Sequence, residues 1–210
     1  MKNPVIIFGS TGIARAALEI FNSNSIVVYG FLDDDKETHG NLIDDISVLS
    51  STDDHGYLKL IGKKCEAFVA TDDNELRREI VDMLKDKRKV MPTNAVHNSA
   101  VVSPSAHLGY GNFINANATV GAGAKVPNHC ILNSGAIVEY GAKLEDFVQV
   151  GAGSIVGANA EIAESAFIGA GVTIVAGVKV GAGARIGAGS VVVADVPEGA
   201  TMFGNPAKPM

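Results

Sequence analysis

The sequence predicts a small α/β domain of Rossmann type followed by a parallel β-helix, and three observations support this prediction. First, short aliphatic runs alternate with amphipathic stretches in the N-terminal part, as in a parallel sheet covered by helices. Second, every sixth residue from Val102 to Val192 is aliphatic, a period that fits neither an α-helix nor an open strand. Third, a small or apolar residue follows four places after almost every one of them, and Gly and Ala fill the turns. Such a repeat is typical of a β-helix, whose short strands meet at corners and point the repeated side chain inward.

These patterns predict a Rossmann-like domain over residues 1–92, the β-helix over 93–195 and a C-terminal tail over 196–210. The basic run 85–89 is interpreted as a solvated surface stretch, and 90–97 leads the chain into the β-helix. In the first domain we expect strands over 5–8, 26–32, 46–49 and 67–70, and helices over 13–22, 52–61 and 74–84.

The repeat of six runs without interruption, so no long loop is expected to leave the β-helix. Among the small or apolar residues that follow four places after the repeated aliphatic ones, only Asn112 departs in size or polarity. Apolar or small residues are expected on every side of the resulting prism. The aliphatic series is Val102, Leu108, Ile114, Val120, Val126, Leu132, Val138, Leu144, Val150, Val156, Ile162, Ile168, Ile174, Val180, Ile186 and Val192.

Candidate ligand-binding residues follow the first two strands of the α/β domain, because ligands of such sheets sit at the carboxyl ends of the strands. Gly9, Ser10 and Gly12 belong to a turn that opens a helix, where backbone amides can hold a pyrophosphate or a ribose. Asp33 and Asp34 end the second strand, where a carboxylate can accept hydrogen bonds from ribose hydroxyls or a base. A simple tight turn and a solvated acidic turn are the respective alternatives.

Asp72, Asp73 and Asn74 follow a later strand and are interpreted as a helix cap. Cys65 and Cys130 lie in different regions and suggest no disulfide framework, and Cys130 takes a small inward position of the repeat.

Composition favours a soluble cytoplasmic protein. The net charge of −6 and a pI of about 5.3 argue against nucleic acid or an anionic membrane as the main partner. No apolar run approaches the length of a membrane span, and the N-terminus leads directly into a strand instead of a signal peptide.

The whole chain resembles the bacterial hexapeptide-repeat sugar acetyltransferases that include sialic acid O-acetyltransferases and the N-acetyltransferases of nucleotide-linked 4-amino sugars. Both halves and the tail carry the resemblance. The matching segments are Ile7-Phe8-Gly9-Ser10-Thr11-Gly12, Gly30-Phe31-Leu32-Asp33-Asp34, Asn74-Glu75-Leu76-Arg77-Arg78, Ile131-Leu132-Asn133-Ser134-Gly135-Ala136-Ile137-Val138-Glu139, Ile186-Gly187-Ala188-Gly189-Ser190-Val191-Val192, Asp195-Val196-Pro197-Glu198-Gly199 and Gly204-Asn205-Pro206-Ala207-Lys208.

This resemblance implies a left-handed β-helix with three hexads to a coil, assembled as a homotrimer with acetyl-CoA in the groove between neighbouring prisms. The nucleotide sugar would reach across from the N-terminal domain. By position, turn amides near Gly157 and Ala158 would face the thioester oxygen, and Ala170 and Ala188 would line the track of the pantetheine arm. The alternative is that these small residues serve only the repeat. Asn133 matches the position that contacts the sugar.

The chain departs from the family in the catalytic motif. The family has Glu-His followed by an acidic residue where this chain has Glu139, Tyr140 and Gly141, and a second family histidine is Gln149 here. Tyr140 therefore stands where the general base is expected, although a phenol is a poor base at neutral pH. His129 is the first residue to consider as a substitute, and otherwise a polar corner of the repeat.

Two hypotheses follow. The first is an acetyltransferase of an amino or hydroxy sugar with weakened or rerouted base catalysis, and the second is a non-catalytic trimer that binds a nucleotide sugar or CoA. A metal-dependent enzyme on this scaffold is not expected, because His97, His107 and His129 lack the spacing of a three-histidine site.

Overall fold

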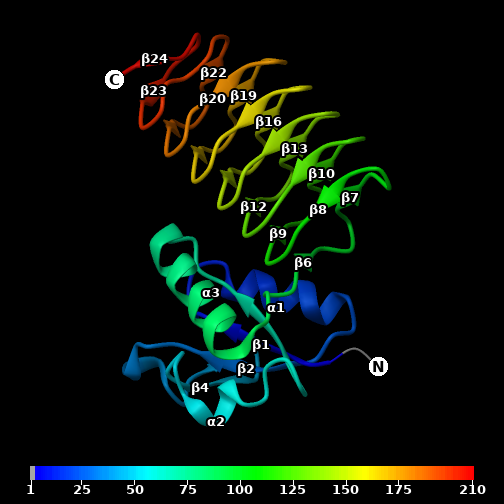
Figure 1. The fold of residues 1–210 in the computed structure, drawn as a ribbon, viewed down its shortest axis with the longest axis vertical. Helices are drawn as coiled ribbons and strands as arrows, with labels where there is room; N and C mark the ends of the chain where they lie inside the picture. Colours follow the sequence, from blue (N-terminus) through cyan, green and yellow to red (C-terminus); the bar gives the residue numbers. More distant parts are fainter. Residues whose placement is uncertain (1–2) are drawn as a thin grey trace. The chain divides into compact units, whose positions relative to one another are not determined.

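The computed structural model describes residues 3–210, which divide into two compact units (Figure 1). The first unit ends at Ala95 and the second runs from Val96 to Met210. Among the described residues, no helix is both long and apolar enough to cross a lipid bilayer. Both cysteines are buried and free.

The first unit is a five-stranded sheet with the order β3-β4-β2-β1-β5, in which β3 alone is antiparallel to its neighbour. Its central strand β1 is buried along its whole length, as its run of aliphatic residues predicts. The strands are β1 (Val5–Phe8), β2 (Val28–Leu32), β3 (Leu42–Ile43), β4 (Ile46–Ser50) and β5 (Glu66–Val69). The helices are α1 (Ala14–Ser23), the 3-10 helix η1 (Lys36–Thr38), α2 (His55–Leu58) and α3 (Asn74–Arg88).

Three details of this unit differ from the sequence-based expectation. The hairpin of β3 and β4 was not predicted. It turns through Asp44 and Asp45, which both have positive φ as a type I′ turn requires. The helix expected over 52–61 is reduced to the single turn of α2. The basic run 85–89 is the last turn and cap of α3, where cations are favoured by the partial negative charge of a helix C-terminus.

Three parallel sheets form the sides of a prism in the second unit, and we name them apolar, charged and mixed after their outward residues. The apolar side comprises β7 (Val101–Val102), β10 (Thr119–Val120), β13 (Ile137–Val138), β16 (Ile155–Val156), β19 (Thr173–Ile174) and β22 (Val191–Val192). The charged side comprises β8 (His107–Leu108), β11 (Lys125–Val126), β14 (Lys143–Leu144), β17 (Glu161–Ile162) and β20 (Lys179–Val180). The mixed side comprises β6 (Ala95–Val96), β9 (Phe113–Ile114), β12 (Ile131–Leu132), β15 (Gln149–Val150), β18 (Phe167–Ile168), β21 (Arg185–Ile186), β23 (Thr201–Phe203) and β24 (Lys208–Pro209).

The interior of the prism confirms the six-residue register. The repeated aliphatic residues from Ile114 onward pack with the small residues of the second series in one continuous core. Asn112, the polar exception, is fully buried and has partners for its amide. Its Nδ2 donates to the Pro127 carbonyl at 2.7 Å, and its Oδ1 accepts from the Cys130 N–H at 2.8 Å. These bonds offset the cost of burying a polar side chain.

The expectation of apolar or small residues on every side is wrong for the charged side. Glu161 lies between Lys143 and Lys179, with N–O distances of 2.9 Å and 3.1 Å. The apolar side does meet the expectation, since its outward residues are Val101, Thr119, Ile137, Ile155, Thr173 and Val191.

The segment 196–210, which the sequence analysis separated as a tail, closes the end of the prism. Val196 forms a bridge to Val180, β23 pairs in parallel with β21, and β24 pairs antiparallel with β23. An antiparallel last strand covers the sheet edge that another coil would otherwise occupy.

Candidate functional site

The first candidate site lies at the carboxyl edge of the N-terminal sheet. Strand β1 lies between β2, which follows it in the chain, and β5, which the chain reaches only after β3 and β4. This reversal of the strand order makes the edge a topological switch point. A cavity of about 150 Å³ opens there, large enough for part of a nucleotide and too small for all of it. Its lining residues are Gly9, Thr11, Asp33, Asp34, Thr52, Ala70, Thr71, Leu76 and Ile80.

Gly9 is required in this turn for two independent reasons. Its φ of +97° favours glycine, and a Cβ on it would lie 2.9 Å from the Ala70 carbonyl oxygen. The absence of a side chain therefore lets the turn after β1 lie directly on the end of β5, which forms the floor of the cavity.

Asp33, which follows the neighbouring strand β2, accepts hydrogen bonds from the same turn. Its Oδ2 accepts from the Ser10 N–H at 2.8 Å and from the Ser10 hydroxyl at 2.6 Å, while Oδ1 accepts from the Asp35 N–H. Burial opposes ionisation of Asp33, but these hydrogen bonds outweigh it and hold the pKa of the carboxyl below its usual value. Ser10 thus fixes Asp33, and neither Ser10 nor Gly12 lines the cavity.

Asp34 ties the end of β2 to the end of β4. Its carboxylate accepts from the Thr52 N–H at 2.8 Å and from the Thr52 hydroxyl at 2.9 Å. Both carboxylates predicted for ligand binding therefore line the cavity and are held in place by protein donors.

The sequence analysis missed Thr52, Leu76 and Ile80 in this site. Thr52 follows β4 as Asp33 follows β2, so the end of β4 was the available signal. Leu76 and Ile80 lie on the first turns of α3, and no pattern marked them. The capping interpretation of 72–74 is confirmed, because Asp73 accepts from the N–H groups of Glu75 and Leu76.

The prism holds its predicted site residues at two different corners. Tyr140 follows β13 at the corner between the apolar and charged sides and is 58% exposed. Strand β16 pairs with β13 so that Gly157 and Ala158 lie one coil beyond Glu139 and Tyr140. We call this the Tyr140 corner.

The backbone at Gly157 and Ala158 corrects one predicted role. The Gly157 N–H donates to the Ile174 carbonyl at 2.9 Å and is not available to a ligand. The Ala158 N–H has no hydrogen-bond acceptor among residues 3–210. A Cβ on Gly157 would lie 2.5 Å from the same carbonyl oxygen, so this glycine serves the approach of the coils. Of the two predicted donors, only Ala158 remains.

Asn133, Ala170 and Ala188 share the corner between the mixed and apolar sides, which we call the alanine corner. Ala170 and Ala188 are exposed and stacked, since the Gly189 N–H donates to the Ala170 carbonyl at 2.8 Å. The Asn133 side chain donates to the Val150 carbonyl at a long 3.4 Å. The ring of Phe203, which sequence reasoning did not single out, covers the position beside Ala188 where a Cβ on Gly187 would stand.

The two corners flank the apolar side, so the structure does not gather the predicted prism residues in one cluster. His129 belongs to neither corner. It lies between the charged and mixed sides, buried to 3% exposure, with its ring 4.9 Å from that of Phe147. His129 thus occupies a corner of the repeat, as expected, but its burial does not suit a base that must meet a substrate.

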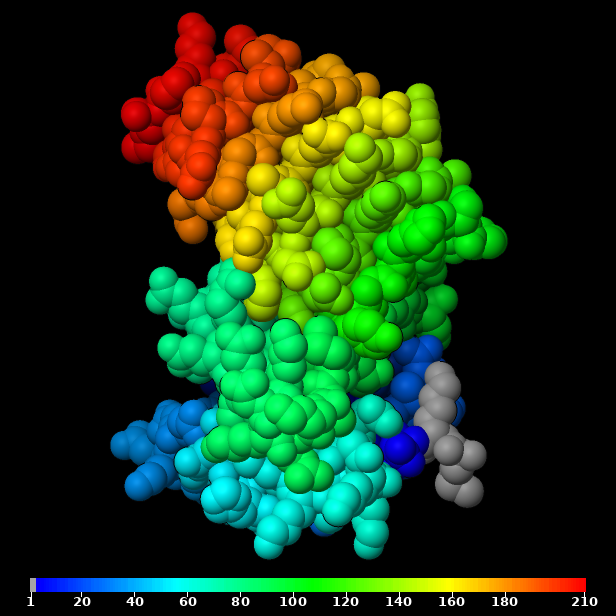
Figure 2. Space-filling model, viewed as in Figure 1, coloured from blue at the N-terminus to red at the C-terminus, as the bar shows by residue number. Residues whose placement is uncertain are grey.

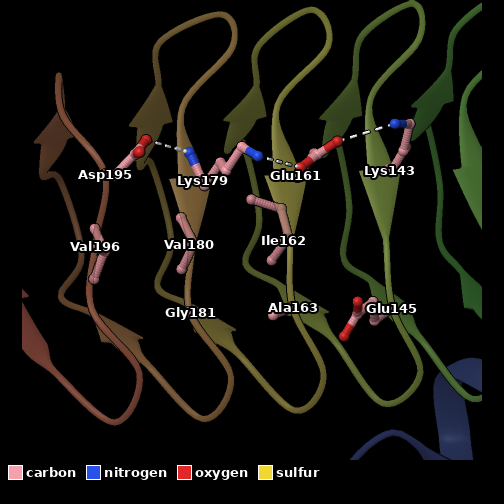
Figure 3. A pocket seen from close by; sticks show the side chains of 10 residues that line it. All are labelled: Lys143, Glu145, Glu161, Ile162, Ala163, Lys179, Val180, Gly181, Asp195 and Val196. Carbon is pink, nitrogen blue, oxygen red and sulfur yellow. Dashed lines mark hydrogen bonds and ion pairs between the residues drawn. The ribbon is translucent and has the colours of Figure 1, made fainter.

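A separate pocket of about 520 Å³ lies on the charged side and includes none of the predicted site residues (Figure 3). The ion pairs of Glu161 with Lys143 and Lys179 run along it. This pocket is larger than the cavity at the end of β1, but it is not where the sequence places the chemistry. Among residues 3–210, no three side chains of His, Cys, Asp or Glu are grouped to hold a metal ion.

Comparisons with known proteins match both units. The model of the PglD N-terminal domain family matches residues 4–84, and the model of the bacterial transferase hexapeptide family, with six repeats, matches residues 159–194. A search of curated protein sequences found no significant match.

Solved structures extend the similarity to the whole chain. PerB from Caulobacter crescentus, in complex with CoA and GDP-perosamine, is 31% identical with a TM-score of 0.90, over 99% of this chain and 97% of that chain. The acetyltransferase domain of PglB from Neisseria gonorrhoeae, in complex with acetyl coenzyme A, is 30% identical with a TM-score of 0.92, over 100% of both chains.

These matches confirm the predicted fold class, a small Rossmann-like domain followed by a left-handed parallel β-helix. They also support acetyl-CoA as the cosubstrate, since both relatives were solved with CoA or its acetyl form. The chain therefore belongs to the bacterial hexapeptide-repeat sugar acetyltransferases.

Proposed function

We propose that this enzyme transfers the acetyl group of acetyl-CoA to the amine of a nucleotide-linked amino sugar, and that it acts as a homotrimer. The observation that carries the proposal is the full-length similarity to PerB, which was solved with CoA and GDP-perosamine together. The cavity at the end of β1 supports it, because carboxylates held in fixed positions and a glycine turn suit part of a nucleotide. A sugar hydroxyl is the alternative acceptor.

Acetyl transfer to an amine requires few catalytic groups from the prism. The amine nitrogen attacks the thioester carbonyl, a C–N bond forms and the C–S bond breaks. CoA leaves as its thiolate and takes up the proton that the acylated nitrogen releases, so the products are the amide and free CoA thiol. Negative charge grows on the carbonyl oxygen, and a fixed N–H donor at that point lowers the barrier. We assign this role to the Ala158 N–H, which is open and lies one coil from Tyr140.

The amine also has to reach the thioester without the extra proton of its ammonium form. We propose that Tyr140, in place of the family's histidine, positions the amine, and that the amine arrives neutral from solution. Histidine variants of the Caulobacter enzyme, one to alanine and one to asparagine, were solved with CoA and GDP-perosamine, so that relative holds both ligands without the exchanged histidine. Holding an amine beside a thioester is itself a large rate effect.

We further propose that each active site forms between two copies of the chain. The Tyr140 corner and the alanine corner bound the apolar side, and one prism keeps them apart. In a cyclic trimer, a heterologous contact sets one corner of each prism beside the other corner of its neighbour. Asn133 lies in the coil that leads into Tyr140, so both corners would meet at similar heights if the threefold axis runs along the prism.

A pair of matched substitutions tests the acetyl-CoA track. Ala188→Trp fills the alanine corner, and we expect it to raise the KM for acetyl-CoA at least tenfold. Ala163→Trp places the same side chain in the charged-side pocket, and we expect it to leave the KM unchanged. Thermal unfolding of both variants shows whether the prism is intact. A larger increase in KM from Ala163→Trp than from Ala188→Trp would indicate that acetyl-CoA binds on the charged side.

Subunit mixing tests the shared site. Ala158→Trp damages the Tyr140 corner and Ala188→Trp the alanine corner, so each homotrimer should have little activity at acetyl-CoA concentrations well below the raised KM. Unfolding and refolding the two together at equal concentration creates interfaces in which both corners are intact. Random pairing makes about a quarter of the interfaces of this kind, and about that share of the parent activity should return. No recovery would mean that each site lies within one chain.

The non-catalytic alternative rests on the departures from the family motif at Tyr140, Gly141 and Gln149, and it is tested with the same protein. Acetyl transfer to a panel of nucleotide-linked amino sugars, followed as release of free CoA thiol, separates the two. Binding of CoA and nucleotide sugar without any transfer by the parent, across the pH range, would favour the non-catalytic trimer.

A further inference from the structure

We propose that the N-terminal unit docks on an anionic lipid bilayer through a lysine-rich patch formed by residues 59–64 and 85–89. The net charge of the chain predicts the opposite, since at −6 it disfavours an anionic partner. The distribution of the charge, and not its sum, decides which partner a surface can meet.

The two segments concentrate the basic residues of the chain. They hold seven of its 17 Lys and Arg residues and one of its 23 Asp and Glu residues, a net charge of +6. The rest of the chain therefore carries −12. At physiological salt a charge is screened beyond about 8 Å, so an approaching anionic surface responds to the patch in front of it. The acidic remainder disfavours every other orientation.

Contacts within the unit hold the two segments together. Arg88, in the last turn of α3, donates from Nη2 to the Ile61 carbonyl at 2.9 Å and to the Lys59 carbonyl at 3.5 Å. A Cβ on Gly62 would lie 2.7 Å from the side chain of Val90. On the face shown in Figure 2, the cyan stretch after α2 borders the blue-green end of α3. The patch is thus a fixed feature of the fold.

The chemistry of the patch suits a diffuse anionic surface. Its six lysines are Lys59, Lys63, Lys64, Lys85, Lys87 and Lys89, and all are exposed. Its one arginine, Arg88, uses its guanidinium on backbone carbonyls. The patch therefore presents the point charges of flexible lysines. It offers no free guanidinium that could form two parallel hydrogen bonds with a single phosphate. Such a surface fits lipid headgroups better than a nucleic-acid backbone.

A half-buried tyrosine lies next to the lysines in the chain and contacts an exposed tyrosine of β2. Tyr57 precedes Lys59 by two residues, and its ring packs edge-on against Tyr29 at 6.4 Å between centroids. Tyr29 is 48% exposed and Val27, just before β2, is 69% exposed. Tyrosine is enriched at the level of lipid headgroups, where its ring and its hydroxyl both find partners.

Vesicle binding by the full-length protein tests the proposal. Each lysine near an anionic surface strengthens association roughly fivefold. We expect the protein to sediment with vesicles of phosphatidylcholine and phosphatidylglycerol, to release as salt rises, and to ignore phosphatidylcholine alone. Lys63→Glu with Lys87→Glu should weaken binding roughly 25-fold or more, while acetyl transfer to a dissolved substrate stays at the parent level.

The control is Lys125→Glu with Lys208→Glu, which changes the net charge equally at exposed positions outside the patch. This variant should bind vesicles nearly as the parent does. The neutral exchange Lys63→Gln with Lys87→Gln should give an intermediate loss, and equal melting temperatures show that all variants fold. Equal loss in both charge-reversal variants, or no binding by the parent at low salt, would overturn the proposal. Tighter binding to an RNA or DNA oligonucleotide, lost in the patch variant, would assign the patch to nucleic acid instead.

Discussion

Tyr140 is a residue whose surroundings limit what it can do. Its ring is exposed at a corner, and its carbonyl accepts from the Asn159 N–H at 3.1 Å in the coil above. The backbone is therefore tied to the prism while the ring is free to meet a substrate. That arrangement suits a residue that orients an amine, and it would suit an imidazole at the same position.

We predict that Tyr140→His raises the rate of acetyl transfer at neutral pH. A positioned imidazole contributes about 10²–10⁴-fold as a general base. The parent rate should rise continuously with pH as the sugar ammonium loses its proton, whereas the variant should add a titration near pH 6.5, about the pKa of an unperturbed histidine. The pH dependence of kcat/KM measures both. A parent that is fast at pH 7 with a bell-shaped profile would reveal a base elsewhere in the site.

Gly141 makes the full restoration of the family motif harder than the sequence suggests. Its φ is +68°, and a Cβ would run into the side-chain oxygen of Asn159. We expect Gly141→Asp to lower stability by about 1–2 kcal/mol, because the left-handed conformation costs that much for residues other than glycine. Adding Asn159→Gly should recover part of the loss. Chemical denaturation measures the difference in stability. An unchanged denaturation midpoint for Gly141→Asp would show that an aspartate adopts this backbone conformation without strain.

Asp33 makes the stability of the N-terminal unit depend on pH. Its folded pKa lies below its usual value, so ionised Asp33 stabilises the fold above that value. This contribution is lost as pH falls through the lowered folded pKa. We predict that Asp33→Asn is less stable than the parent at neutral pH and that the difference shrinks in acid. Thermal unfolding at several pH values tests this, and a constant difference would mean that charge plays no part.

Ser10 and Asp33 also show where sequence reasoning stops at this scale. Both were placed in the site from their positions after β1 and β2. Their mutual hydrogen bonds depend on the parallel pairing of these strands, which no local pattern states. Gly157 is a second example. Its place in the repeat was predictable, but only the stacked coil shows that its N–H is already used.

At the scale of elements, the period of six predicted the strands of the prism correctly because it reports one physical requirement, an inward aliphatic side chain on each short strand. It could not predict the charged side, because outward residues are not constrained by packing. The β3–β4 hairpin was missed for a related reason. Its first strand is two residues long and gives no alternation to detect.

We predict a large difference between two isoleucines of neighbouring strands. Ile162 points inward and is 1% exposed, so Ile162→Ala should lower stability by about 2–5 kcal/mol through lost burial and a cavity. Ile155 points outward on the apolar side and is 36% exposed. In the monomer, Ile155→Ala should cost much less. Urea unfolding at a concentration too low for assembly compares them, and equal costs would contradict the inward register.

At the scale of the whole molecule, the apolar side is the surface that we expect to be covered. Ile155→Glu should convert the trimer to monomer and remove activity, because a charge in an apolar interface loses its water. Lys125→Glu on the charged side should leave the trimer intact. Light scattering at micromolar concentration reports the mass. A parent that is monomeric, or a trimer disrupted by the Lys125 change instead, would refute this choice of interface.

The way the coils stack restricts how this molecule can change length. Residues that pair between neighbouring strands of one side, such as Ile137 with Ile155 and Val156 with Ile174, are always one complete turn of the prism apart. Deleting a whole coil would return every later residue to the side it had before. Deleting a single hexad would rotate everything beyond it by one side, and Ala188 would leave its corner although each strand still fitted the core. Viable insertions and deletions should therefore come in whole coils, and the core alone would not reject the others.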